Sequence, residues 1–330
     1  MRLYSVIVPV FNRLNEVKEL LDSLALQSYK NFEVVLIEDG STQPCEFLLT
    51  SYTSLNIRYY FKSNTGPGDS RNFGMSKAEG DYFIFFDSDC IIPSHYFETL
   101  EHHLNSNLLD AFGGPDRAHE SFSDIQKAIN QAMTSFVTTG GIRGRKQQLD
   151  KFQPRSFNMG FKKEVYINVG GFSDIHPGED PDLSYRIMNA GYTTSLIPGA
   201  YVYHKRRIDF EKFYTQVYKF GMVRVILLKW YPEKAKAVYY LPAVFVLGTS
   251  FLLLMSTLIH FSLMPLILLT IVIWAEAIFN TGSFKIAALS VVASYIQLIG
   301  YGLGFLKAFW KITMNGANER EAFPHLFFKK

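Results

Sequence analysis

The chain has 330 residues, of which 48% are hydrophobic and 19% charged, and its formal net charge is +3. This length allows one large α/β domain with an additional region. The small net charge argues against a nucleic-acid-binding protein, so we expect no nucleic-acid partner. Cys45 and Cys90 have neither metal-site nor disulfide-framework spacing, and we interpret both as reduced thiols.

The first ninety residues alternate apolar runs with segments of helical periodicity. Strands are predicted at Tyr4–Pro9, Glu33–Ile37, Ile57–Phe61 and Tyr82–Phe86. Apolar residues between Leu14 and Leu24 recur at helical spacing, with Asn12 as candidate N-cap. A second helix begins at Gly66-Pro67 and ends before Gly80. Together these elements predict a doubly wound α/β sheet.

Acidic residues follow two of these strands. The carboxyl ends of parallel strands meet at one edge of a sheet, where ligands bind. Asp87 and Asp89 come directly after a strand, and residues two apart in an extended chain point the same way. Two such carboxylates form a site for Mg²⁺ or Mn²⁺, although a polar turn has the same pattern. Asp39 is either a turn residue before Gly40 or an acceptor for a nucleotide's base or ribose.

The helix that begins at Gly66 offers free amides and a favourable dipole to an anion. Arg71 adds a forked cation suited to a phosphate or a base edge. The stretch matches neither a Walker loop nor G-x-G-x-x-G, so the kinase and dehydrogenase classes lack their motifs.

A further helix is predicted at Pro181–Ala190, with Asp180 as its cap. Acids at this helix start either stabilise the first turn or supply a general base for an acceptor hydroxyl. His204 is either structural or a metal ligand. The stretch from Phe112 to Phe157 is irregular, and the part around Gly140–Phe152 is either a mobile substrate loop or a plain surface loop.

Charged residues become rare after Tyr239, and only Glu276 and Lys285 precede Lys307. This shift predicts a membrane region, with apolar runs at Tyr239–Ile259, Leu263–Phe279 and Ile286–Leu306. Three crossings place the C-terminus outside, whereas its basic residues favour the inside, so the number of crossings stays open. Phe210–Tyr231 mixes aromatic and basic residues, as in an interfacial helix or a packing helix. The short first strand does not suit a signal peptide, so we expect the N-terminal domain to be cytoplasmic.

The motifs, taken together, resemble those of family-2 inverting glycosyltransferases of the GT-A fold, over about Ser5 to Gly221. They are Ser5-Val6-Ile7-Val8-Pro9-Val10-Phe11-Asn12, Glu38-Asp39-Gly40-Ser41, Arg71-Asn72, Asp87-Ser88-Asp89, Gly170-Gly171-Phe172 and Glu179-Asp180. The resemblance implies a nucleotide-sugar donor bound by Pro9, Phe11, Asn12, Asp39, Arg71, Asn72, Asp87 and Ser88. It implies that Asp87, Asp89 and His204 hold Mn²⁺ or Mg²⁺. Asp180 resembles the catalytic base, with Glu179 beside it, and Asn158 and Gly171 fall where the family lines its sugar and acceptor cleft.

The expected organisation is a GT-A domain at residues 1–207, an interfacial segment at 208–237, transmembrane helices at 238–312 and a basic tail at 313–330. The run Gln216-Val217-Tyr218-Lys219-Phe220 departs from the Gln-x-x-Arg-Trp of processive members, which favours transfer of a single sugar. We expect a UDP-sugar donor in preference to GDP or dTDP, and a glycan or lipid-linked acceptor in polysaccharide or glycolipid synthesis. A multi-pass protein of the inner membrane would suit this role. The alternatives are a polyprenyl-phosphate glycosyltransferase and a non-catalytic nucleotide-sugar-binding protein.

Overall fold

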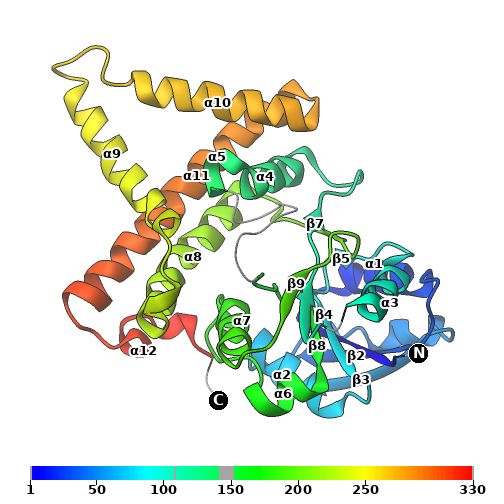
Figure 1. The fold of residues 1–330 in the computed structure, drawn as a ribbon. Helices are drawn as coiled ribbons and strands as arrows, with labels where there is room; N and C mark the ends of the chain where they lie inside the picture. Colours follow the sequence, from blue (N-terminus) through cyan, green and yellow to red (C-terminus); the bar gives the residue numbers. More distant parts are fainter. Residues whose placement is uncertain (1, 108, 141–151, 329–330) are drawn as a thin grey trace. The chain divides into compact units, whose positions relative to one another are not determined.

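The computed structural model describes residues 2–107, 109–140 and 152–328, and the chain forms two compact units (Figure 1). We call them the sheet unit and the helical unit. The described part of the sheet unit is residues 2–119, 152–205 and 327–328, without residue 108. That of the helical unit is residues 120–140 and 206–326. Residues 120–140, which we expected in the first domain, therefore group with the helices. The proposed substrate loop around Gly140–Phe152 lies largely outside the described residues.

A seven-stranded sheet forms the centre of the sheet unit as described here. Its order is β3 (Asn56–Lys62), β2 (Phe32–Asp39), β1 (Tyr4–Val10), β4 (Tyr82–Phe86), β8 (Asn158–Lys162), β6 (Ala111–Gly113) and β9 (Thr194–Leu196). The first four strands are parallel, whereas β8 runs antiparallel to both of its neighbours. The predicted α/β fold is confirmed, and all four predicted strands are present.

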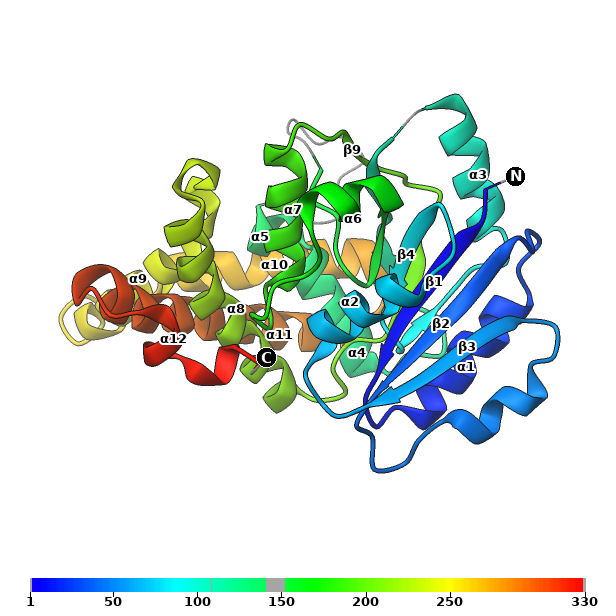
Figure 2. The same cartoon turned by 90° about the horizontal axis from the view of Figure 1, so that it is seen from below.

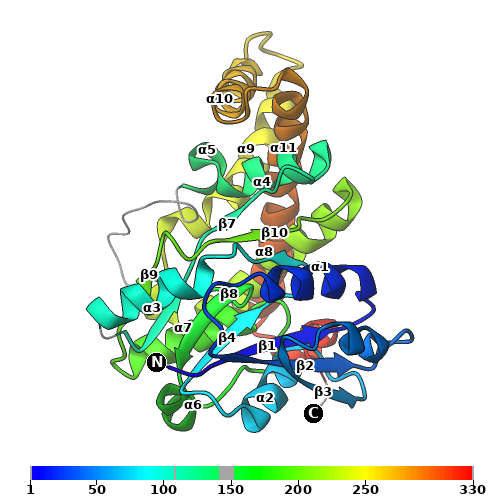
Figure 3. The ribbon, with the colours of Figure 1, turned by 90° about the vertical axis from the view of Figure 1, so that its right-hand side faces the viewer.

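Helices cover both faces of this sheet (Figures 2 and 3). The helices α1 (Leu14–Ala25) and α3 (Tyr96–Ser106) pack on one face with Val6 and Val8 of β1. The helices α2 (Pro67–Lys77), α6 (Lys163–Val169) and α7 (Glu179–Asn189) pack on the other with Ile7. Burial on both faces explains why the central strands are apolar throughout.

Two predicted helix caps are wrong. Arg13, not Asn12, precedes α1, and Asn12 adopts a left-handed φ of 52° that asparagine tolerates better than most residues. Gly178, with φ of 120°, precedes α7, so Asp180 is a first-turn residue and not a cap. Glycine adopts this φ without a Cβ penalty, and the acids then lie where the helix dipole favours them.

A small three-stranded sheet joins distant parts of the sheet unit. Its order is β5 (Cys90–Ile91), β10 (Val202–His204) and β7 (Asp116–Arg117). The antiparallel pairing of β10 with β5 sets His204 opposite Cys90. Because β5 follows β4 after three residues, this pairing brings His204 to the carboxyl end of β4.

The helical unit consists of helices from two separate stretches of the chain. Its main helices are α4 (Asp124–Thr134), α5 (Phe136–Thr139), α8 (Phe210–Trp230), α9 (Leu241–Met255), α10 (Met264–Thr281) and α11 (Phe284–Ala308). A π-helical turn (Phe309–Met314) follows, and the short α12 (Glu319–Ala322) lies in the stretch we expected to be a basic tail. Glycines allow α8 to pack closely on α11, since a Cβ on Gly304 would overlap the Tyr218 carbonyl and one on Gly221 that of Tyr301. This supports the packing-helix alternative for α8, and an interfacial location stays a prediction.

The two charged residues of the apolar region both bind the stretch at 120–140. Glu276 of α10 accepts hydrogen bonds from the Ser135 hydroxyl and, at 2.9 Å, from the Phe136 amide. Lys285 forms an ion pair of 2.7 Å with Asp124. The interruption of the apolar run by Glu276 therefore has a structural explanation, because its carboxylate caps α5.

Two helices of the described chain are long and apolar enough to cross a membrane. They are Met264–Thr281, with 18 residues, and Phe284–Met314, with 31. The predicted span at Tyr239–Ile259 corresponds to α9, whose 15 residues are fewer than the roughly 20 that a straight crossing requires. Large apolar side chains of α10, such as Ile267, Leu268 and Phe279, are exposed in the structure.

The α8–α11 contact predicts that Gly304→Ala destabilises the helical unit. A methyl group there meets backbone, which cannot move aside easily, and overpacking of this kind costs about 1–3 kcal/mol. Gly248→Ala in α9 is the matched control, because its added methyl meets nothing within 4 Å. Thermal unfolding in detergent should show a lower midpoint for Gly304→Ala and an unchanged or higher one for Gly248→Ala. Equal midpoints would contradict this packing.

Candidate active site

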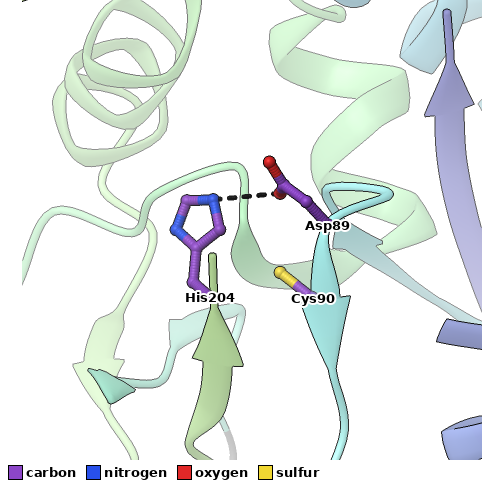
Figure 4. Close-up of side chains that lie close together, drawn as sticks. All are labelled: Asp89, Cys90 and His204. Atoms are coloured by element: carbon purple, nitrogen blue, oxygen red, sulfur yellow. Dashed lines mark ion pairs between the residues drawn. The ribbon is translucent and has the colours of Figure 1, made fainter. Parts of the chain in front are cut away.

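The three predicted metal ligands, Asp87, Asp89 and His204, lie together at the end of β4. His204 Nε2 is 3.2 Å from Asp89 Oδ1 (Figure 4) and 3.8 Å from Asp87 Oδ2. The ring of Phe157 stacks on His204 with centroids 4.8 Å apart. The structure thus brings together Asp87, Asp89 and His204, although His204 lies far from both aspartates in the sequence.

This group has a composition that suits a divalent cation. Ligand atoms of Asp89, Cys90 and His204 lie within 4.8 Å of one another, and Asp87 adds a second carboxylate nearby. Carboxylate oxygens with one imidazole fit Mn²⁺ or Mg²⁺. Cys90 was not a predicted site residue. Its buried thiol lies within 3.6 Å of the Phe157 carbonyl, and thiolate is not a preferred ligand of these hard cations.

Arg71 connects this group to the first turn of α7. Its guanidinium, only 3% exposed, donates to Asp87 Oδ1 at 2.6 Å and to Glu179 Oε1 at 3.1 Å. Its charge centre lies 5.3 Å from the ring centroid of Phe172. Two carboxylates from distant parts of the chain therefore share one buried cation, which compensates the cost of their desolvation.

The neighbouring acids of α7 have different surroundings. Glu179 is buried and also lies 3.1 Å from His176 Nδ1. Burial alone would raise the pKa of Glu179, but the charges of His176 and Arg71 lower it. Burial alone would lower the pKa of His176, and the Glu179 carboxylate raises it. Asp180 is more exposed, at 17% of its side chain, and lies 3.7 Å from Arg155.

Asp39 lies at the carboxyl end of β2 and is held by three donors. Its carboxylate accepts hydrogen bonds from the amides of Thr65, at 3.0 Å, and Gly66, at 2.9 Å. Lys62 forms an ion pair with it at 2.6 Å. An ionised carboxylate has about four acceptor positions, so these bonds leave room for a further donor.

The other predicted donor-binding residues occupy the same edge or its support. The side-chain oxygen of Asn12 accepts from the Thr42 backbone amide at 2.9 Å, and the backbone amide of Asn12 donates to the Ser41 hydroxyl. Asn72 donates to the carbonyl of Phe172 at 2.8 Å and accepts from its amide at 2.7 Å. The remaining three residues of this set differ in exposure: Pro9 is partly buried, Phe11 is 50% exposed and Ser88 is buried.

Asn158 and Gly171, predicted to line a sugar and acceptor cleft, both pack closely against neighbouring residues. The Asn158 side chain is fully buried, accepts from the Tyr96 hydroxyl at 2.6 Å and donates to the Ala200 carbonyl at 2.8 Å. Gly171 packs so closely on Asn72 that a Cβ there would overlap the amide. Both residues help to hold the backbone in position, and their place in a sugar and acceptor cleft stays a prediction.

Sequence reasoning missed His176, Arg155 and Lys62. Lys62 could have been found, since it ends the third parallel strand and so lies at the same edge as Asp39. His176 and Arg155 lie in irregular segments, where no periodicity indicates which way a side chain points.

Comparisons with known proteins identify the family of the chain. A model of glycosyl transferase family 2 matches residues 5–170, half of the chain. An uncharacterized glycosyltransferase of Rickettsia felis is 43% identical over 218 residues, which cover 60% of this chain and 35% of that protein. One from Haemophilus influenzae is 27% identical over 192 residues, 56% of this chain and 61% of that protein. The chain spans about a third of the length of the Rickettsia relative.

Among solved structures, the chain resembles the mannosyltransferase PcManGT from Pyrobaculum calidifontis. The TM-score is 0.57 at 15% sequence identity, over 94% of this chain and 87% of that protein. This likeness concerns the fold, whereas the family match rests on sequence. The chain belongs to glycosyl transferase family 2, and its fold is GT-A-like.

Proposed function

We propose that this chain is a metal-dependent, inverting glycosyltransferase of the inner membrane, which transfers one sugar from a nucleotide-diphosphate donor. The observation that carries the proposal is the arrangement around Arg71. The guanidinium fixes Asp87 of the metal-binding group and Glu179 of α7 in one site. Arg71 would therefore set the distance between the residues that bind the donor and the acids that face the acceptor.

The donor would bind along the edge that carries Asp39, Asp87 and Asp89. Asp39 would accept a hydrogen bond from the base or ribose, beside the exposed ring of Phe11. Asp87, Asp89 and His204 would hold Mn²⁺ or Mg²⁺, which supplies positive charge to the departing diphosphate. A mannosyltransferase of similar fold binds GDP-Man and Mn²⁺, which supports this class of donor.

Asp180 is the residue that we propose as the general base. Glu179 is occupied by Arg71 and His176, and its lowered pKa makes it a poor proton acceptor. Asp180, in the same helical turn, is more exposed, so an acceptor hydroxyl can approach it. Removal of that proton as the hydroxyl attacks the anomeric carbon would give inversion in one displacement.

The acceptor is a glycan or a lipid-linked molecule, and one observation favours a lipid carrier. Residues 120–140, part of the stretch from Phe112 to Phe157, belong to the helical unit and bind Glu276 and Lys285 of the apolar helices. A polyprenyl phosphate is therefore the second candidate acceptor. A multi-pass location with the sheet unit on the cytoplasmic side follows from the same helices as part of the proposal.

The metal site predicts the outcome of a donor panel with UDP-, GDP- and dTDP-sugars. We expect turnover of one donor, a UDP-sugar, in Mn²⁺ and none in EDTA. Asp89→Ala should lower turnover by about 10²- to 10³-fold, the usual loss for one electrostatic contact to a transition state. Asp81→Ala replaces an exposed aspartate at the start of β4 and serves as control. Turnover that survives in EDTA would overturn metal dependence.

Substitution of Asp180 and of Glu179 in α7 should affect different properties of the protein, namely catalysis and stability. Asp180→Asn should lower kcat by about 10²- to 10⁴-fold, as for loss of a general base, while donor affinity stays unchanged. Glu179→Gln should instead lower the free energy of unfolding by roughly 3 kcal/mol, because it breaks a buried ion pair. Near-normal kcat for Asp180→Asn would show that another residue is the base.

The loss of stability in Glu179→Gln should also depend on pH. A lowered pKa means that Glu179 stabilises the fold above its ordinary value of 4.5, and this is lost as pH falls. A raised pKa means that His176 contributes below its ordinary value of 6.5, and this is lost as pH rises. Urea unfolding should therefore show the largest difference between about pH 5 and 6.5. A difference that does not decrease as pH rises above about 6.5 would leave Arg71 as the only partner that matters.

A further inference from the structure

Residues 327 and 328 return to the sheet unit after the last helices of the chain. Phe327 forms an antiparallel bridge with Ile175, and the Phe328 amide donates to the Asp174 carbonyl at 2.9 Å. The segment is thus paired with the loop that precedes α7. This loop leads directly into Glu179 and Asp180, the first two residues of α7 and acids of the proposed site.

One side of the Phe328 ring lies on Gly66, the residue before α2. A Cβ on Gly66 would overlap the ring, so ring and backbone are in direct contact. The Gly66 amide donates to Asp39 Oδ2 at 2.9 Å. The position of Gly66 therefore determines where one oxygen of the Asp39 carboxylate is held.

The same ring also contacts His176, with ring centroids 5.9 Å apart. His176 Nδ1 lies 3.1 Å from Glu179, and Glu179 in turn binds Arg71. Close packing reinforces this side, since a Cβ on Gly68 of α2 would come within 2.8 Å of the Ser173 carbonyl. Phe328 thus contacts a residue that holds Asp39 and a residue that holds Glu179.

We propose that Phe328 is a positioning residue for the nucleotide part of the donor. The inference rests on the proposed function, because Asp39 and Arg71 are the donor-binding groups that it would position. By filling the space between Gly66 and His176, the ring sets the separation of the two halves of the site. The ring acts on the site through Gly66 and His176 and not through Asp180, the proposed general base. Loss of the ring should therefore change donor affinity more than the rate of the chemical step.

The test measures binding of UDP and of GDP, each with Mn²⁺, to the full chain by isothermal titration calorimetry. Phe328→Ala should weaken binding of the preferred diphosphate about tenfold, because its contacts are no longer held in place. Phe328→Tyr, which keeps the ring, should bind within about threefold of the unchanged chain. Phe47→Ala removes a ring that is 62% exposed in the same unit and should have no effect.

Kinetics separate positioning from a merely structural role. With the donor found in the panel, Phe328→Ala should raise KM about tenfold while kcat stays within about threefold. If Phe328→Ala does not fold, Phe328→Leu is expected to show a smaller rise in KM with the same unchanged kcat. Unchanged affinity in the folded alanine variant would overturn the inference, as would tighter binding, which would mean that the ring blocks the site. Absence of diphosphate binding by the unchanged chain would instead overturn the proposed function and this inference with it.

Discussion

The geometry of the site depends on one buried cation shared by two carboxylates. Arg71 comes from α2, Asp87 from the end of β4 and Glu179 from the first turn of α7. Neither Arg71 nor Glu179 could be buried alone, because an unpaired ion in the interior costs several kcal/mol, whereas Asp87 is partly exposed. Their mutual pairing therefore requires that α2, β4 and α7 keep their relative positions. The group of Asp87, Asp89 and His204 and the acids at the start of α7 are held together by the same requirement.

This constraint also separates the roles of adjacent residues. Glu179 satisfies Arg71 and His176 and remains ionised, whereas Asp180 keeps a more exposed carboxylate. A helix start supplies both environments within one turn, since successive side chains point in different directions around the axis. The same region thus holds the site together through one acid and leaves the next accessible to a substrate.

The sequence predicts the parts of this arrangement that rest on local pattern. Apolar runs indicate all four parallel strands, and the rule that ligands bind at strand ends places Asp39, Asp87 and Asp89 at one edge. It does not predict the partners of Arg71 and Glu179, or the buried bonds of Asn158, because these contacts join residues far apart in the chain. The stretch at 120–140 could not be assigned to the helical unit for the same reason. Its partners Glu276 and Lys285 are visible in the sequence only as interruptions of an apolar run.

The central claim is a single displacement in which Asp180 takes the acceptor proton. The most direct test is the anomeric configuration of the product, determined by NMR from the coupling constant of the anomeric proton. The donor found by the panel would be supplied with Mn²⁺ and its acceptor. Inversion relative to the donor sugar is the predicted result. Retention would contradict the account, because it requires two displacements or another route that this assignment of Asp180 does not provide.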